Sequence, residues 1–279
     1  MTVAVVTDSA AAIPSDLASE WDITVVPMWL VIDGVAVREG DQALGELLGD
    51  RQVTTSAPTP GAFEEAITDA LGRGASDVLV LTIAAAMSAS HDAAVVAARD
   101  VGAHVCVVDS MTAAGAQALV VLAAARAARD GSSLDECARV AEDVAGRVRL
   151  VATVPDLEHL VRSGRVPGIA GWAGRTLGLS PLFEFRTGSV HRLRPARGVT
   201  AAYDRMVARF RRDARPGHRA HVVALHALAP AAAAALLERL RDVDPVESFT
   251  SGFGSVMVVH AGPGLVGLAW WWEPVSRLS

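Results

Sequence analysis

The feature that most limits how this chain can fold is the alternation of strand-like and helix-like segments along its first half. Short apolar runs at Val3–Val6, Val78–Ile83 and Val105–Val108 each lead into a segment with helix-start signals. Strands that alternate with helices in this way form a parallel sheet covered by helices. We therefore expect an α/β protein whose first lobe, residues 1–152, is a parallel sheet flanked by helices.

The pattern changes near residue 150. Strand-like pieces at 181–186 and 190–194 are joined across Thr187-Gly188, which predicts an antiparallel pair. The other expected elements of this half are strands near 150–154, 221–226, 256–260 and 265–271 and helices near 199–212 and 230–241. Together they predict a second α/β lobe, residues 153–279, with a mixed or antiparallel sheet.

Turn and capping residues predict three local boundaries. Asp33-Gly34 follows a β-rich segment and is a strong hairpin signal. Thr59 before Pro60 has the pattern of a helix N-cap with proline at the first helical position, which places Thr54–Pro58 in the loop before a helix. Ser133 with Glu136 forms a capping box for a further helix.

Composition narrows the cellular setting. The longest stretch without a formal charge, Ser248–Trp272, exceeds the roughly 20 residues that span a bilayer. It contains several glycines and Pro263, so we expect buried strands around a turn and no integral membrane segment. The first residues lack the features of a secretory signal, and the two cysteines exclude a disulfide framework. These observations favour a cytoplasmic protein.

Several catalytic chemistries are excluded by the residues that are missing. All 25 basic residues other than histidine are arginine, so there is no lysine for a Walker loop or a Schiff base. No G-x-S-x-G motif occurs, and the eight histidines show no metal-ligand spacing with carboxylates. We therefore predict no catalytic residue, no metal ion and no cofactor.

Positive charge gathers in one segment. Between Arg186 and Arg219, ten arginines against two aspartates give +8 in a chain whose net charge is −6, which leaves −14 for the rest. Such a segment is most often a solvated helix face, but it could also meet nucleic acid or an acidic partner. No zinc-finger spacing, aromatic-basic stacking motif or helix-turn-helix pattern supports nucleic acid, so no such partner is predicted.

Polar clusters follow the expected strands of the first lobe. They are Thr7-Asp8-Ser9, Thr54-Thr55-Ser56, Ser88-Ala89-Ser90-His91 and Asp109-Ser110-Met111-Thr112. Each alone fits helix capping or turn formation. The ends of strands in an open α/β sheet are also where ligands bind, and hydroxyls near helix N-termini favour an anion. The four clusters together therefore indicate an anion site.

The second lobe offers two basic complements to this site. Arg165 follows Ser163-Gly164, where the glycine is expected to end a short helix and the guanidinium can reach an anionic group. His260 is expected at the end of an apolar strand, before the tight turn Ala261-Gly262-Pro263-Gly264. A surface position for the arginine and a core position for the histidine are equally compatible with the sequence.

With these clusters in hand, the chain resembles the DegV family over essentially its full length. The similar segments, in the family's order, are Val6-Thr7-Asp8-Ser9 with Ile13-Pro14, Thr55-Ser56-Ala57-Pro58-Thr59-Pro60, Met87-Ser88-Ala89-Ser90, Val108-Asp109-Ser110, Ser163-Gly164-Arg165-Val166, Leu179-Ser180-Pro181-Leu182 and His260-Ala261-Gly262-Pro263-Gly264. The chain departs from the family pattern at Ala57, Ala89, Ser90, His91 and Ser163. No single motif decides the resemblance; their number and order do.

The resemblance implies a two-lobed protein that holds a long-chain fatty acid, such as palmitate, stearate or oleate, between its lobes. The carboxylate would lie against the hydroxyls of Thr55, Ser56 and Ser88, beside Ala89, with Arg165 and His260 as basic partners. Family members of this kind are binding subunits without catalytic activity of their own. They present the carboxylate to a separate ATP-dependent fatty acid kinase and retain the acyl phosphate, and the arginine-rich segment could be the surface that meets the kinase.

Two alternatives remain open from the sequence. The first is an enzyme in its own right, a phosphotransferase or acyl hydrolase acting at the same cleft. The second is a regulatory or nucleic-acid-binding protein that uses the arginine-rich segment.

Overall fold

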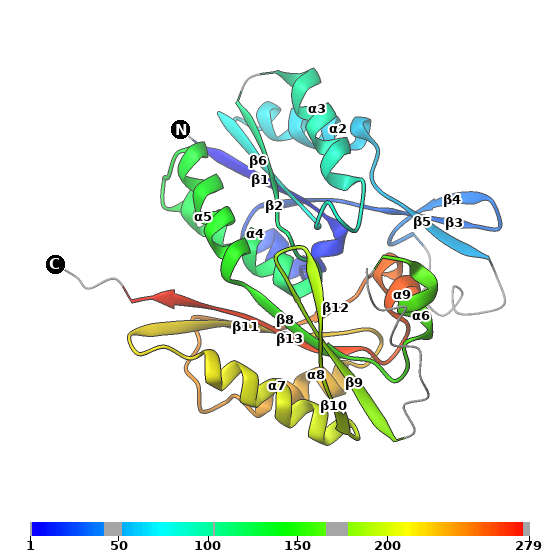
Figure 1. Ribbon diagram of the computed structural model, residues 1–279. Coiled ribbons are helices and arrows are strands. Elements are labelled where there is room, and N and C mark those ends of the chain that lie inside the picture. Colours follow the sequence, from blue (N-terminus) through cyan, green and yellow to red (C-terminus); the bar gives the residue numbers. More distant parts are fainter. Residues whose placement is uncertain (1, 42–51, 103, 166–177, 276–279) are drawn as a thin grey trace.

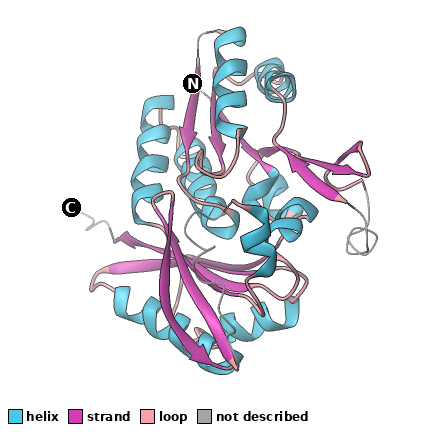
Figure 2. Ribbon diagram, turned by 45° about the vertical axis from the view of Figure 1, so that its right-hand side comes forward, coloured by secondary structure: helices cyan, strands magenta, loops and turns pink. Residues whose placement is uncertain are grey.

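The computed structural model describes residues 2–41, 52–102, 104–165 and 178–275. Among these residues the strands form three sheets. The two larger sheets lie one above the other, with helices between them and on their outer faces (Figure 1). The third sheet is small and projects to one side (Figures 1 and 2).

The first sheet is entirely parallel, as the alternating pattern predicts. Its strands, in spatial order, are β2 (Ile23–Val26), β1 (Val3–Asp8), β6 (Asp77–Thr82) and β7 (Val105–Asp109). Every residue of β6 is buried, which accounts for a continuous apolar run rather than an alternating one. The carboxyl ends of these strands meet at one edge, so the polar clusters that follow β1, β6 and β7 come together there.

Helices cover both faces of this sheet. On one face lie α2 (Pro60–Gly72) and α3 (Ser90–Val101), and on the other α4 (Ala114–Arg129) and α5 (Leu134–Arg147). Two short helical turns, η1 (Ser9–Ala11) and α1 (Ser15–Glu20), follow β1. Both capping predictions are confirmed: the Thr59 side chain accepts from the N–H of Ala62, and Ser133 with Glu136 makes both bonds of the capping box.

The second sheet is mixed, which confirms the prediction for the second half. Its spatial order is β10 (Ser189–Arg197), β9 (Leu179–Arg186), β8 (Arg149–Thr153), β13 (Val266–Pro274), β11 (His218–His226) and β12 (Glu247–Gly252). Among the described strands of this sheet, only β11 and β12 pair in parallel, and β9 and β10 form the expected hairpin across Thr187-Gly188. Strand β12 is not predicted from the sequence, because its residues are polar or small apart from Phe249.

The outer face of the second sheet packs on α7 (Val199–Asp213) and α8 (Pro230–Glu238). Its inner face packs on α4 and α5, and one apolar cluster runs from the first sheet through these helices to the second. Gly115 makes the approach close, since a Cβ there would lie 2.7 Å from Cγ1 of Val223. Helix α4 packs on both sheets, so its contacts do not separate the chain into two lobes. The division into residues 1–152 and 153–279 stays a prediction.

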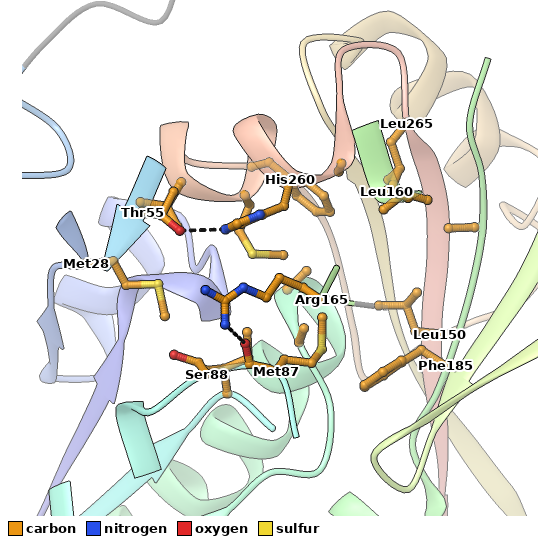
Figure 3. A pocket seen from close by; sticks show the side chains of 18 of the residues that line it. Met28, Thr55, Met87, Ser88, Leu150, Leu160, Arg165, Phe185, His260 and Leu265 are labelled. Atoms are coloured by element: carbon orange, nitrogen blue, oxygen red, sulfur yellow. Dashed lines mark hydrogen bonds between the residues drawn. The ribbon is translucent and has the colours of Figure 1, made fainter. Parts of the chain in front are cut away.

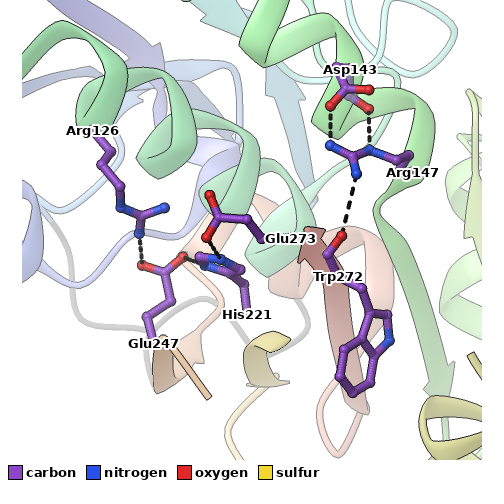
Figure 4. A network of polar contacts seen from close by, with 7 residues as sticks. All are labelled: Arg126, Asp143, Arg147, His221, Glu247, Trp272 and Glu273. Carbon is purple, nitrogen blue, oxygen red and sulfur yellow. Dashed lines mark hydrogen bonds and ion pairs between the residues drawn. The ribbon is translucent and has the colours of Figure 1, made fainter. Parts of the chain in front are cut away.

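A buried histidine ties three strands of the second sheet to α4. The Nδ1 of His221 on β11 lies 2.8 Å from a carboxylate oxygen of Glu247 on β12, and its Nε2 lies 3.0 Å from Glu273 on β13 (Figure 4). Arg126 of α4 pairs with the other oxygen of Glu247 at 3.1 Å. His221 therefore has a structural role in the sheet, stacked on Trp271 with ring centroids 4.3 Å apart.

The small antiparallel sheet consists of β4 (Val35–Arg38), β3 (Trp29–Ile32) and β5 (Val53–Ser56). The hairpin at Asp33-Gly34 is confirmed, and both residues have positive φ. Prediction of a loop for Thr54–Pro58 is wrong for Thr54, Thr55 and Ser56, which lie in β5. They pair with β3, a partner more than twenty residues earlier, and the local loop signals do not reveal that pairing.

Two short helices complete the described chain, α6 (Glu158–Ser163) and α9 (Ser255–Ala261). The predicted strand near 256–260 is wrong, so His260 lies in the last turn of α9 and not at the end of a strand. The apolar, β-branched run Val256–Val259 favours a strand locally. The backbone N–H of Val256 at its start donates to Glu39, which follows β4, and this bond favours a helix instead. Among the described residues, no helix is long and apolar enough to cross a membrane.

Candidate ligand-binding site

A cavity of about 320 Å³ lies where the two larger sheets and the small sheet meet. It is lined by Met28, Thr55, Ser56, Ala57, Ile83, Met87, Ser88, Ala89, Ala113, Ala114, Leu150, Ala152, Leu160, Arg165, Phe183, Phe185, Val190, Leu225, Phe253, Val256, Met257, His260, Ala261 and Leu265. Small-molecule sites occupy about 300–1,000 Å³, so its size suits one slender ligand. All six predicted site residues, namely Thr55, Ser56, Ser88, Ala89, Arg165 and His260, line it.

The polar end of the cavity is built from segments far apart in the sequence (Figure 3). Thr55 on β5 and His260 on α9 are joined by a hydrogen bond of 2.6 Å between Oγ1 and Nε2. The guanidinium of Arg165 lies between this pair and Ser88 (Figure 3). A ligand head group at this end would therefore meet hydroxyl, imidazole and guanidinium groups together.

Arg165 supplies the charge of this end. It is the only formally charged residue among the described residues that line the cavity. Gly164, with φ +63°, ends α6 in the left-handed conformation and turns the chain so that Arg165 faces the cavity. The guanidinium donates to the carbonyl of Met87 at 3.4 Å and has no carboxylate partner within the described ranges. Its positive charge is therefore available to an anion.

His260 is held neutral in this arrangement. Burial, and then the positive charge of Arg165, lower its pKa from 6.5 to about 4. The imidazole therefore carries no charge at pH 7, and the Thr55 contact is a bond between neutral groups. A carboxylate beside Arg165 would reverse the second effect and raise the pKa of His260.

The serine side of the polar end is preorganised by local bonds. The Oγ of Ser88 accepts from the backbone N–H of Ser90 at 3.2 Å and lies 2.9 Å from the Oγ of Ser90. Ala89 stands at the N-cap of α3 with no side-chain cap. Ser56, Ala89 and Arg165 are exposed, so the polar end is also the mouth of the cavity.

The rest of the lining is apolar and comes from both halves of the chain. Strands β8, β9 and β10 contribute Leu150, Phe183, Phe185 and Val190, with Leu225 from β11. No charged side chain from the described residues enters this part. The sequence reading did not assign these positions, because the pairing of the second sheet decides which face of each strand points inward.

Two of the four polar clusters support the cavity from behind instead of lining it. Asp8, fully buried, accepts from the N–H groups of Ile83 at 2.9 Å and Ala10 at 3.2 Å and from Nε2 of Gln117 at 3.0 Å. Burial nevertheless raises the pKa of Asp8 from 3.8 to about 6. Asp109 accepts from the N–H of Ala85 at 3.3 Å. Both carboxylates therefore hold the loop that carries Ser88.

Glu39 is a supporting residue that the sequence reading missed. Its carboxylate accepts from the N–H of Val256 at 2.8 Å and from the hydroxyl of Ser9, and so connects the end of β4 to α9. Ser9 in turn accepts from the N–H of Met28 at 2.9 Å. These contacts position α9, and with it His260, yet their partners lie too far apart in sequence for any local pattern to indicate them.

Comparison with known proteins agrees with this architecture. The family model described as "Uncharacterised protein, DegV family" matches residues 2–273. The chain belongs to the DegV family. A DegV domain-containing protein of Mycobacterium tuberculosis is 35% identical to it over 275 residues, covering 96% of each chain.

Solved DegV structures have the same fold. A DegV family protein from Thermus thermophilus, described by its fatty acid binding, superposes with a TM-score of 0.89 at 28% identity, covering 97% of this chain and 99% of its own. DegV from Bacillus subtilis, described as a fatty acid binding protein, superposes with a TM-score of 0.85 at 27% identity, covering 98% of this chain and 100% of its own.

Among the described residues of the present chain, no group of histidine, cysteine, aspartate or glutamate side chains could hold a metal ion.

Proposed function

We propose that this protein binds one long-chain fatty acid, of the class of palmitate, stearate or oleate, with the carboxylate at Arg165 and the tail between the two larger sheets. The observation that carries the proposal is the polarity of the cavity: one unpaired guanidinium at the mouth and apolar side chains over the rest. The relatives described as fatty acid binding have the same fold.

The tail supplies the affinity in this proposal. Burying about 14 methylenes at about 0.8 kcal/mol each gives on the order of 11 kcal/mol before the cost of association. An isolated carboxylate could not enter the same apolar space, because burying an unpaired charge is far more costly. The head group therefore stays at the mouth, and its contacts serve orientation.

The polar end matches a carboxylate group by group. Arg165 offers paired donors to its two oxygens, the hydroxyl of Ser88 can donate one further bond, and that of Thr55 can do so when Nε2 of His260 donates to it. Ser56 lies beside them at the mouth, and Ala89 brings only a methyl group to the rim. A bound carboxylate should raise the pKa of His260 above its value of about 4 in the free protein.

We further propose that the bound carboxylate is presented to a separate ATP-dependent fatty acid kinase and that the carrier retains the acyl phosphate. The exposure of Arg165 at the mouth supports this step, since a second protein can reach the carboxylate without opening the tail cavity. The cavity offers no lysine and, in the described lining, no carboxylate base. On this view the chain is a binding subunit and not an enzyme alone.

One observation favours a second candidate, an acyl hydrolase or phosphotransferase acting in the same cleft. The 2.6 Å contact between Thr55 and His260 has the geometry of a nucleophile and its base. No carboxylate among the described residues orients His260 through its other nitrogen, so the third group of a catalytic triad is missing from the described chain. Turnover of an acyl phosphate or ester by the purified chain, abolished by Thr55→Val, would establish this alternative.

Native mass spectrometry with lipid extraction tests the binding proposal. We expect a co-purified or added C16–C18 fatty acid at one per chain, with binding at least about tenfold weaker in Arg165→Ala because a charge-assisted bond is lost. Arg139→Ala, an exposed arginine on α5 outside the cavity, is the matched control. A protein that takes up no fatty acid, or an Arg165 variant that binds as well as the control, would overturn the proposal.

A further inference from the structure

A second cavity, of about 550 Å³, lies behind the first at the opposite face of the second sheet. It is lined by Gly146, Arg147, Val148, Arg149, Arg186, Thr187, Ser189, His191, Arg212, Asp213, Ala214, Arg215, Trp270 and Trp272. These residues come from the end of α5, the start of β8, the β9–β10 turn, the end of α7 and β13. None of them lines the candidate fatty-acid site.

Strands β8, β9 and β10 form a common wall between the two cavities. Leu150, Phe185 and Val190 line the first, and their neighbours Arg149, Arg186 and His191 line the second. Successive side chains of a strand point to opposite faces of the sheet, which explains the alternation of apolar and basic residues. The second cavity is thus built by the basic positions of the same strands.

Of the described residues, five arginines and one aspartate line this cavity. Two of the arginines are neutralised within the protein. Arg149 pairs with Glu184 at 2.8 Å and with Asp213 at 2.7 Å. Arg147 is bound by Asp143 and donates to the carbonyl of Trp272 at 3.3 Å (Figure 4).

The remaining three arginines have no such partner. The exposed side chains of Arg186, Arg212 and Arg215 form no ion pair or hydrogen bond with any residue in the described ranges. Asp213, the one carboxylate that the described part of the chain contributes to the lining, already pairs with Arg149 and accepts from the indole N–H of Trp270 at 3.3 Å. Three like charges around one cavity repel one another, so a bound counter-charge would stabilise the arrangement.

The other polar side chains of the lining, apart from Asp213, can each donate a hydrogen bond. Thr187 and Ser189 contribute hydroxyls, and Trp272 contributes an Nε1 that is buried and has no acceptor among the described residues. A negatively charged ligand that is rich in acceptors therefore complements this lining. Phosphate meets both needs, and its oxygens match the paired donors of guanidinium groups.

We propose that this cavity binds a phosphate-bearing anion through Arg186, Arg212 and Arg215. Its volume falls in the range of small-molecule sites, which favours a phosphoester or a phospholipid head group over an extended protein surface. The shared chemistry is one phosphate group held by two or three guanidiniums, whichever source supplies it.

Titration with pyrophosphate and inorganic phosphate tests the proposal, because Trp270 and Trp272 line the cavity and their fluorescence should report occupancy. Sodium chloride at matched ionic strength controls for screening. We expect saturable binding that is at least about tenfold weaker in Arg212→Ala/Arg215→Ala and also weakened in Arg186→Ala. Arg139→Ala, on α5 and outside both cavities, should bind like the wild type.

Sedimentation with phosphatidylglycerol or phosphatidylcholine vesicles distinguishes the sources. Binding to phosphatidylglycerol vesicles but not to soluble phosphate, lost in the arginine variants, assigns the site to lipid head groups. Binding to soluble phosphate but not to vesicles assigns it to a free phosphoester. No binding to either probe, or binding equal in the wild type and the folded double variant, would overturn the proposal.

Discussion

The buried carboxylate of Asp8 should make the stability of this protein depend on pH in a defined direction. Its pKa rises from 3.8 to about 6 because burial disfavours the charge more than its three N–H donors favour it. The folded state therefore holds the proton more tightly than the unfolded chain does. This contribution to stability is complete below about pH 3.8 and is lost as the pH rises through about 6.

Replacing Asp8 by asparagine removes this titration. A shift of about 2 pKa units at about 1.36 kcal/mol each corresponds to about 3 kcal/mol over the whole range, and to about 2 kcal/mol between pH 7.5 and pH 4.5. Lowering the pH over that interval should therefore raise the free energy of unfolding of the wild type by about 2 kcal/mol relative to Asp8→Asn. The NH2 group of the new asparagine also faces one of the three N–H donors, which loses its acceptor. This should lower the free energy of unfolding by about 1–3 kcal/mol at every pH.

Urea unfolding followed by circular dichroism at several pH values measures the difference between the two proteins. Contributions of other titrating groups cancel in that difference, because both proteins contain them. Asp69→Asn, an exposed position on α2, is the matched control and should change stability by less than about 0.5 kcal/mol. A wild-type to Asp8→Asn difference that is the same at pH 7.5 and pH 4.5 would refute the reasoning.

Three further predictions concern the cavity. NMR titration of His260 should give a pKa near 4 in the free protein and a higher pKa with a bound fatty acid; equal values would contradict the proposed head-group position. Because the unfolded chain binds this proton more tightly, the folded protein should lose stability as the pH falls from 6.5 toward 4. Gly267→Ala places a Cβ 2.9 Å from Cδ1 of Leu225 and 3.0 Å from the carbonyl oxygen of Val151. Thermal unfolding should therefore show a free energy of unfolding that is lower by about 1–3 kcal/mol, and calorimetry should show weaker binding of C18 acids. Thr55→Val removes the partner of His260 and should weaken fatty acid binding with little loss of secondary structure; unchanged affinity would exclude a role for this hydroxyl.

The sequence predicted the parts of this fold that depend on local pattern. The buried run of β6, the hairpin at Thr187-Gly188 and the cap at Thr59 each follow from a few neighbouring residues, and the structure confirms them. Where strand ends are known, their polar residues can be placed at one edge of the sheet. This reasoning places Ser88 beside the cavity, whereas Thr55 on β5, Arg165 after α6 and His260 on α9 reach it through tertiary packing.

The errors arose where distant contacts override local preference. The run Val256–Val259 has strand-forming side chains, but Glu39, more than two hundred residues earlier, satisfies the start of a helix there. Thr55 stands among loop-forming residues, but β3 supplies its pairing partner. The apolar wall depends on which faces of β8, β9 and β10 turn inward, and only the register of the second sheet decides this.

Helix α4 has a consequence for how the chain is made. Twelve of its residues, from Ala114 to Ala125, are buried between two sheets, yet one of those sheets is assembled from strands that follow it in sequence. As the chain emerges from the ribosome, α4 is therefore covered on one side long before the other side exists. We expect the nascent first half to expose an apolar surface and to need chaperone protection until β11 and β13 arrive.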